Sequence, residues 1–242
     1  MQLDTIFRIY SMSKPITSVA IMMLFEEGCL RLSDPISHYL PDYKKVLVMV
    51  GSKENQIELE KPNREITIRD LLTHTSGLTY GSSGNTYIDN LYQTLIMKRF
   101  YEEPDSPLED ILTPLPAIPL IHQPGTAFHY SIATDLLGYL IQVIAGIPFE
   151  DYLKEKIFDP LNMVDTAFFV PLEKLERFAC NYKHDENGKL IEIDPIQSSP
   201  YTNPRHTPAG GSGLVSTAHD YLRFMQMLLN KGELDGIRLL SP

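Results

Sequence analysis

Residues 5–24 read TIFRIYSMSKPITSVAIMML, and this stretch decides the fold. Residues 5–10 alternate in part between apolar and polar side chains, which predicts a short β-strand. The residues that follow repeat apolar side chains at the i, i+3, i+4 spacing of a buried helix face. Pro15 is tolerated only in the first turn of such a helix, so the helix is expected to begin near residues 11–12, and Gly28 ends it. The apolar positions are Ile16, Val19, Ala20, Met23 and Leu24.

The junction between this strand and this helix carries a serine and a lysine three positions apart, Ser11 and Lys14. Residues at this spacing share one face of a helix, so the two side chains can touch. A helix N-terminus favours negative charge, and a serine needs a neighbouring base before it can act as a nucleophile. Lys14 could be this base in its neutral form, which burial favours. The pattern alone is weak evidence, because it also arises by chance, and an ordinary polar helix start is the alternative.

Tyr130 and Ser131 form a second candidate, between the turn-forming residues 124–126 and an apolar helix. A tyrosine at such a junction can hold its hydroxyl over a cleft, although a half-buried aromatic residue that covers the core is the alternative. His74, at the end of a short predicted helix, is interpreted as a hydrogen-bonding cap. Residues 210–214 read GGSGL and are interpreted as a tight turn where the backbone passes close to another group.

The chain as a whole is predicted to be helix-rich with a few strands, an α+β architecture. We expect residues 1–32 to begin a sheet-and-helix domain, residues 33–165 to form a mostly helical domain, and residues 166–242 to return to the sheet domain. The remaining predicted elements are short helices beginning at Asp34 and after Thr67, helices over 133–145, 148–158 and from Thr217 to Gly232, a strand over 166–170, and a hairpin that turns at Asn187-Gly188.

Composition excludes several classes of protein. The 242 residues are 43% hydrophobic with a formal net charge of −10, which argues against a disordered chain and against a nucleic-acid partner. No apolar run predicts a membrane span and no signal peptide opens the chain, so a cytoplasmic location is expected. Cys29 and Cys180 are predicted to be unpaired buried thiols, with a single disulfide as the alternative. No motif predicts a metal site or a cofactor.

Several stretches together resemble the serine β-lactamase and penicillin-binding-protein superfamily, and in particular its class C-like branch, which includes the family VIII carboxylesterases. The stretches occur in the family's order and span nearly the whole chain. The resemblance implies a β-lactamase/transpeptidase-like fold, in which a sheet packed by helices lies beside a helical domain and the site lies between them. The matching stretches are FRIYSMSKPIT (7–17), LRLSDPI (30–36), LLTHTSGL (71–78), PGT (124–126), YS (130–131), IFDPLNM (157–163) and GSGLVST (211–217).

The resemblance also implies roles for individual residues. Ser11 is similar in position to the family's nucleophile, Lys14 to its proton-transfer partner, and Tyr130 to the tyrosine that shares the proton, so that an acyl-enzyme forms. Ser131 and Ile132 take the positions of substrate-binding residues. Ile132 stands where the family's Tyr-x-Asn motif has an asparagine, which favours an esterase over a β-lactamase or a D-alanyl-D-alanine peptidase. The expected partner is a small-molecule ester or amide, and the oligomeric state is left open.

Measured against this family, the chain is expected to be incomplete at both ends. Members carry strands before the position of Thr5 and a long stretch after Pro242, which holds a third motif and one N–H donor of the oxyanion hole. Loss of one such donor typically costs about 2.7–4 kcal/mol of transition-state stabilisation. An inactive homologue that only binds a ligand or partner is therefore the alternative to an active serine hydrolase.

Overall fold

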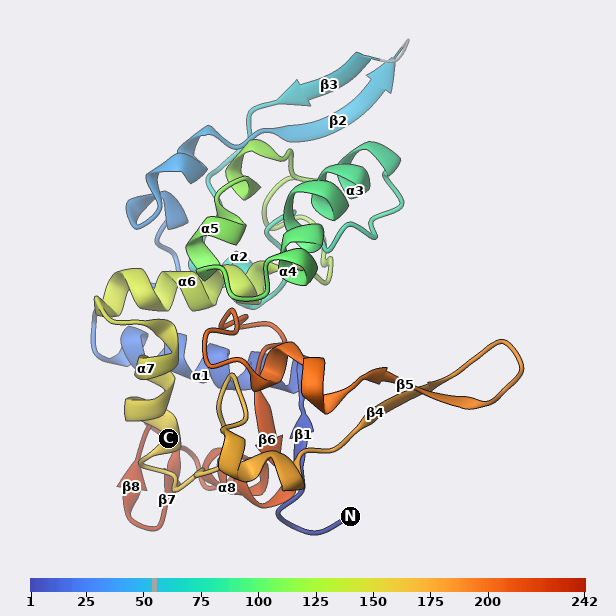
Figure 1. The fold of residues 1–242 in the computed structure, drawn as a ribbon. Helices are drawn as coiled ribbons and strands as arrows, with labels where there is room; N and C mark the ends of the chain where they lie inside the picture. The colour runs from blue at the N-terminus through green and yellow to red at the C-terminus, as the bar shows by residue number, and fades with distance from the viewer. Residues whose placement is uncertain (54–55) are drawn as a thin grey trace.

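The computed structural model describes residues 1–53 and 56–242, in which helices predominate and the strands form two-stranded pairs (Figure 1). The helices are α1 (Ser13–Glu26), α2 (Ile68–Leu72), α3 (Thr86–Tyr92), α4 (Lys98–Glu102), α5 (Leu108–Leu112), α6 (Ala133–Ala145), α7 (Phe149–Leu153) and α8 (Ala218–Leu229). The strands are β1 (Ile6–Arg8), β2 (Val48–Lys53), β3 (Gln56–Glu60), β4 (Asn181–His184), β5 (Leu190–Asp194), β6 (Val215–Thr217), β7 (Glu233–Leu234) and β8 (Ile237–Arg238).

Two long helices, α1 and α6, pack against each other at the middle of the molecule (Figure 1). A 3₁₀ turn over Tyr10–Met12 leads into α1, which has Pro15 in its first turn as predicted. Left-handed glycines follow the ends of both helices, Gly28 (φ 76°) after α1 and Gly146 (φ 71°) after α6. The apolar faces of α1 and α6 belong to one core that continues into α2, α3, α5 and α7.

The strand that leads to α1 is fixed from two sides. β1 pairs antiparallel with β6, which places Arg8 opposite Val215. The buried guanidinium of Arg8 forms an ion pair with Asp194 and lies 4.0 Å from the centre of the Phe178 ring. It also donates to the carbonyl oxygen of Ala179 at 2.7 Å. The end of β1, and with it the start of α1, therefore has a defined position.

Three local predictions are confirmed. The short helix predicted after Thr67 is α2, and Thr67 and Asp70 form a reciprocal capping box at its start. The turn at 187–188 joins β4 to β5, which project together as a hairpin (Figure 1). Thr217 caps α8 by accepting the N–H of Asp220 at 3.1 Å.

The strand predicted over 166–170 is wrong. The structure has only a single bridge there, between Ala167 and Val215. The next residue, Phe168, is buried with its ring 5.5 Å from that of Phe149, so the chain leaves the edge of β6 to fill the core. Packing of Phe168 into the core therefore ends the pairing after one residue.

Two further expectations need correction. Cys29 and Cys180 are free thiols, but both are exposed rather than buried, because each lies beside a surface turn or hairpin. The short helix expected to begin at Asp34 is a 3₁₀ turn over Ile36–His38. Pro35 stays extended (ψ 135°) and precedes that turn instead of opening it.

Candidate active site

Ser11 is exposed in the turn between β1 and α1. The preceding residue, Tyr10, has a left-handed backbone (φ 44°), which is unusual for a bulky residue and turns the chain sharply. The Tyr10 hydroxyl accepts a hydrogen bond from Asn181 Nδ2 at 2.7 Å. On the other side, the carbonyl oxygen of Met12 accepts one from the Tyr221 hydroxyl at 3.0 Å. Both neighbours of Ser11 are therefore held in place.

Three of the predicted site residues, Ser11, Lys14 and Tyr130, meet at one oxygen atom. The Tyr130 hydroxyl donates to Ser11 Oγ at 2.8 Å, and the Lys14 ammonium donates to the same oxygen at 3.2 Å. Lys14 is only 9% exposed, and its Nζ lies 4.6 Å from the centre of the Tyr130 ring. A proton can pass between Ser11 and either neighbour along an existing hydrogen bond.

A buried carboxyl group lies behind Lys14. The Lys14 Nζ also donates to the carbonyl oxygen of Gly211 at 2.8 Å, and the Gly211 N–H donates to Asp135 Oδ1 at 2.9 Å. The Tyr80 hydroxyl donates to Asp135 Oδ2 at 3.2 Å. Burial raises the pKa of Asp135, while the Gly211 N–H and the Lys14 charge act against that rise. Burial and the Asp135 charge raise the pKa of Tyr80, so its phenol remains a donor.

In the glycine turn beside Lys14, the backbone passes close to both central helices, α1 and α6. A Cβ on Gly211 would lie 2.5 Å from Asp135 Oδ2 and 2.8 Å from the Tyr80 hydroxyl. A Cβ on Gly210 would lie 2.7 Å from the carbonyl oxygen of Thr134 on α6. Glycine is therefore required at both positions by the space available, and the turn predicted from the sequence serves to bring a carbonyl oxygen to Lys14.

Ser131 and Ile132, the residues predicted to bind substrate, lie in the interior next to Tyr130. Neither side chain has any exposed surface. Ser131 Oγ lies 3.1 Å from Nδ1 of His74, whose ring is 4.9 Å from that of Tyr130. Ile132 is the N-cap residue of α6 and belongs to the core. From the interior, the two side chains support the chain segment that carries Tyr130.

Asp135 and Tyr80 are site residues that sequence reasoning missed. Asp135 lies on the buried side of a mostly apolar helix, and a carboxyl group in such a position needs donors around it. That anomaly is visible in the sequence of residues 133–145. Tyr80 has no comparable local signal, because its role depends on a partner 55 positions away.

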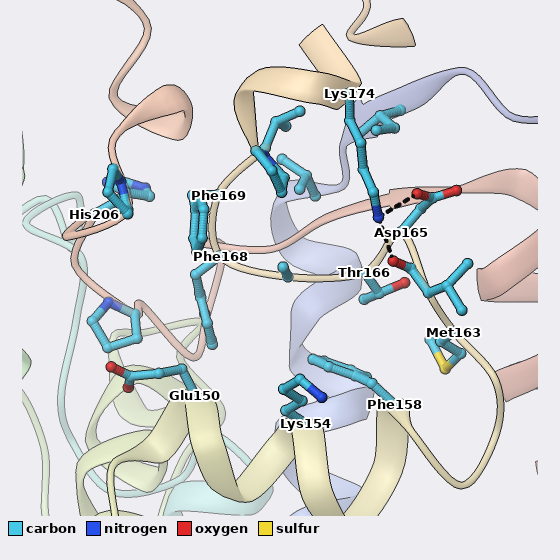
Figure 2. A pocket seen from close by; sticks show the side chains of 18 of the residues that line it. Glu150, Lys154, Phe158, Met163, Asp165, Thr166, Phe168, Phe169, Lys174 and His206 are labelled. Carbon is cyan, nitrogen blue, oxygen red and sulfur yellow. Dashed lines mark hydrogen bonds and ion pairs between the residues drawn. The ribbon is translucent and has the colours of Figure 1, made fainter.

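A pocket of about 400 Å³ lies elsewhere, between α7 and residues 163–171 (Figure 2). Aromatic and aliphatic side chains such as Phe158 and Phe168 line most of it. The ion pair between Lys174 and Asp165, 2.8 Å long, lies at its edge (Figure 2). None of the three residues that meet at the serine oxygen lines this pocket, so we place the candidate active site at the start of α1.

Among residues 1–53 and 56–242, no group of three or more histidine, cysteine, aspartate or glutamate side chains could hold a metal ion. In the same described part of the chain, no single helix is long and apolar enough to cross a membrane. α6 and residues 149–158 meet that criterion only as a pair bent by 84°.

Known proteins match the chain along its whole length. A family model named Beta-lactamase matches residues 1–241. Protein Rv1367c of Mycobacterium tuberculosis is 41% identical over 242 residues, which is 100% of this chain and 58% of that protein. Esterase EstB of Burkholderia gladioli is 31% identical over 243 residues, which covers 94% of this chain and 58% of EstB. The chain thus spans 58% of the length of both curated relatives.

A solved structure with the same fold is that of EstCE1, a hydrolase with promiscuous acyltransferase activity. It superposes on this chain with a TM-score of 0.78 at 27% sequence identity. The match covers 98% of this chain and 62% of EstCE1.

Proposed function

The chain belongs to the Beta-lactamase family, within the serine β-lactamase and penicillin-binding-protein superfamily, and from that premise we propose that it hydrolyses carboxylic esters through an acyl-enzyme. The observation that carries the proposal is the meeting of two proton-carrying side chains at one serine oxygen. Tyr130 and Lys14 both hydrogen-bond to Ser11 Oγ. A serine is activated as a nucleophile by a neighbouring base of this kind.

Acylation requires a base for the proton of Ser11. In the reactive form Lys14 is the ammonium ion and Tyr130 is the phenolate. The hydrogen bond across the 2.8 Å between the two oxygens then reverses, and Ser11 donates to Tyr130. Ser11 Oγ forms a bond to the carbonyl carbon of the ester while its proton passes to Tyr130. The bond from that carbon to the alcohol oxygen then breaks as the proton passes on to the departing oxygen. The N-terminus of α1, two residues beyond Ser11, favours the negative charge that develops.

Water completes the cycle by the same route. A water molecule gives a proton to Tyr130 and bonds to the acyl carbon, and Ser11 Oγ leaves and recovers its proton. One difficult reaction is thereby divided into two easier steps. An alcohol in place of water would give transfer of the acyl group to a new ester, and acyl transfer is the second activity of EstCE1.

Esters are the favoured substrates for three reasons. Ile132 is fully buried and apolar, so the position after Ser131 offers no side-chain amide to the amide group of a β-lactam or peptide. Tyr10 and Met12, on either side of Ser11, are each 47% exposed and offer apolar surface to an acyl or alcohol group. EstB, which is 31% identical to this chain, is named an esterase.

A fluorophosphonate probe tests the serine chemistry, because it reacts with activated serines without knowledge of the substrate. We expect the chain to be labelled and Ser11→Ala to remain unlabelled. Ser18→Ala, on α1, is the matched control and should be labelled like the parent. Equal labelling of Ser11→Ala and the parent would refute the proposal, and an unlabelled parent would favour the inactive homologue.

The substrate class is tested by comparing three reactions of the same preparation. These are hydrolysis of a short-chain p-nitrophenyl ester, hydrolysis of a chromogenic cephalosporin, and release of D-alanine from a D-alanyl-D-alanine peptide. We expect the ester to be turned over with the highest kcat/KM. Dominant cephalosporin cleavage or D-alanine release would keep the serine mechanism and overturn the esterase assignment.

A further inference from the structure

His74 holds the chain on both sides of Tyr130. The carbonyl oxygen of His74 accepts the N–H of His129 at 2.8 Å, and its Nδ1 accepts the N–H of Ser131 at 3.3 Å. One residue therefore binds the backbone one position before and one position after the tyrosine that reaches Ser11. The imidazole also packs against the Tyr130 ring, with the ring centres 4.9 Å apart.

His74 is itself rigidly placed. Its backbone is left-handed (φ 54°), a conformation that residues other than glycine rarely adopt and that is concentrated at functional sites. Its N–H donates to the carbonyl oxygen of Leu71 at 3.3 Å, which ties it to the end of α2. The start of the same helix is locked by the capping box of Thr67 and Asp70, and Arg64 donates to Asp70 at 2.8 Å. The imidazole thus projects from a fixed support.

Tyr130 needs such a support. It precedes α6, so helical hydrogen bonds do not hold it, and its side chain is 43% exposed. A hydrogen bond to Ser11 directs proton transfer only while the phenol oxygen stays in position. A displacement of about 1 Å in a catalytic group can lower a rate by about 100-fold.

The contact with Ser131 requires one form of the imidazole. A backbone N–H can only donate, so the 3.3 Å hydrogen bond exists only when Nδ1 carries no hydrogen and the ring hydrogen lies on Nε2. The Ser131 hydroxyl, 3.1 Å from the same nitrogen, then donates to Nδ1 as well. In an imidazolium ion Nδ1 also carries a hydrogen. This N–H would point at the Ser131 N–H, and the hydrogen bond between the two residues would be lost. Burial lowers the pKa of His74, and the Lys14 charge on α1 lowers it further, so the neutral form is favoured. Among the described residues, Tyr130 is the other titratable group against the ring, while the Asp135 carboxyl group on α6 bonds to different donors.

We propose that His74 is a positioning residue for Tyr130: its carbonyl oxygen and its unprotonated Nδ1 fix the chain on either side of the tyrosine and so hold the phenol oxygen against Ser11. This inference rests on the proposed function, because it takes Tyr130 to be the group that moves the serine proton. His74 touches neither the substrate nor Ser11 in this scheme and acts through Tyr130.

Two substitutions at His74 distinguish the contribution of the hydrogen-bond acceptor from that of the imidazole ring. The side-chain oxygen of His74→Asn can replace Nδ1 as acceptor for the Ser131 N–H, whereas His74→Ala has no acceptor. We expect His74→Asn to keep the rate of probe labelling at Ser11 within about threefold of the parent. We expect His74→Ala to lose at least tenfold, in keeping with displacement of a catalytic group. His219→Ala, which removes an exposed imidazole on α8, is the matched control and should leave the rate unchanged.

The pH profile provides a readout that a purely structural role would not move. As the pH falls, the parent gains a proton on Nδ1 and loses the contact, but His74→Asn has no group that titrates there. The ratio of the parent labelling rate to that of His74→Asn should therefore fall as the solution becomes acidic. A constant ratio, equal losses in the two variants, or full activity of His74→Ala would each overturn the inference.

Nuclear magnetic resonance of ¹⁵N-histidine and ¹³C-tyrosine distinguishes failure of this inference from failure of the proposed function. The parent should show His74 with its hydrogen on Nε2, and the Tyr130 resonances should shift in His74→Ala but not in His74→Asn. If the parent is not labelled by the probe, the proposed function fails and these spectra still decide the positioning role. The positioning role would be refuted if the hydrogen lay on Nδ1, or if the Tyr130 resonances did not shift in His74→Ala.

Discussion

Asp135 and Gly211 are joined by a 2.9 Å hydrogen bond from the glycine N–H to the aspartate Oδ1, although they lie 76 positions apart in the chain. The carbonyl oxygen of the same glycine accepts the Lys14 ammonium at 2.8 Å. One residue therefore links the buried carboxyl group of α6 to the lysine that faces the serine. The position of Lys14 depends on how closely this glycine approaches α6.

Gly211→Ala should damage both stability and activity. Its Cβ would lie 2.5 Å from Asp135 Oδ2 and 2.8 Å from the Tyr80 hydroxyl, where Asp135 is buried and Tyr80 is partly buried. Overpacking of this kind costs about 1–3 kcal/mol, and the displaced carbonyl oxygen would no longer fix Lys14. Urea denaturation and the rate of probe labelling measure the two effects. Gly51→Ala, in the β2–β3 hairpin, is the control and should change neither, because its φ is not left-handed and its Cβ would meet only the movable end of the Glu58 side chain at 3.2 Å.

Asp135→Asn should alter the dependence of stability on pH. The substitution keeps the shape and one acceptor for the Gly211 N–H, but it removes a carboxyl group whose pKa is raised above 3.8 by burial. A raised pKa means that the folded parent binds the proton more tightly than the unfolded chain. The parent therefore loses stability as the pH rises from about 4 until the group ionises, and the variant does not.

Urea denaturation of the parent and Asp135→Asn between pH 4 and pH 7 measures this difference. The free energy of unfolding of the variant should rise relative to that of the parent across this interval. Asp105→Asn, which removes a carboxylate from the surface, should follow the parent curve. Parallel curves for the parent and Asp135→Asn would show that burial does not raise the pKa of the Asp135 carboxyl group.

The elements that the sequence predicted are those whose signals are local. Pro15 and Gly28 mark the two ends of α1, and apolar spacing marks its buried face. The β2–β3 hairpin was missed because a bulge between Met49 and Gly51 breaks the alternation of its first strand. No Asn-Gly pair marks a turn in that part of the sequence either. The signal for a strand is weakest where the strand is irregular.

The site residues also fall into those with a local signal in the sequence and those without one. Ser11 lies in the 3₁₀ turn that leads into α1 and Lys14 in the first turn of α1, so their contact follows from the spacing of three positions along a helical backbone. Tyr130 reaches the same oxygen from 119 positions away. Its place before an apolar helix marked it as a candidate, but only the family resemblance paired it with Ser11. Asp135 and Tyr80 depend on packing between α6 and distant segments, which residue spacing does not encode. Long-range contacts were predictable only where a family pattern supplied them.

Tyr130→Phe should remove most of the reactivity of Ser11 without changing the fold. The substitution deletes the hydroxyl that lies 2.8 Å from Ser11 Oγ and leaves the ring contacts with His74 and Tyr80 in place. Loss of a general acid–base group typically lowers a rate by about 10²–10⁴-fold. The rate of fluorophosphonate labelling measures the loss, and circular dichroism checks the fold. Tyr101→Phe, on an 80% exposed side chain, should react like the parent. Labelling of Tyr130→Phe at the parent rate would assign proton transfer to Lys14 alone.

Asp165→Asn should destabilise the protein at neutral pH but not in strong acid. Its carboxylate accepts hydrogen bonds from Arg177 at 2.6 Å and Lys174 at 2.8 Å, and these lower the pKa of Asp165 to about 2. A lowered pKa means that the stabilisation is complete above the ordinary value of 3.8 and is lost as the pH falls toward 2. Because solvent screens this partly exposed network, we expect a difference of at most about 1 kcal/mol. Denaturation of the parent, Asp165→Asn and the exposed control Asp42→Asn, followed from pH 7 to pH 2, measures it. A gap between the parent and Asp165→Asn that persists unchanged to pH 2 would mean that the amide disturbs packing rather than charge.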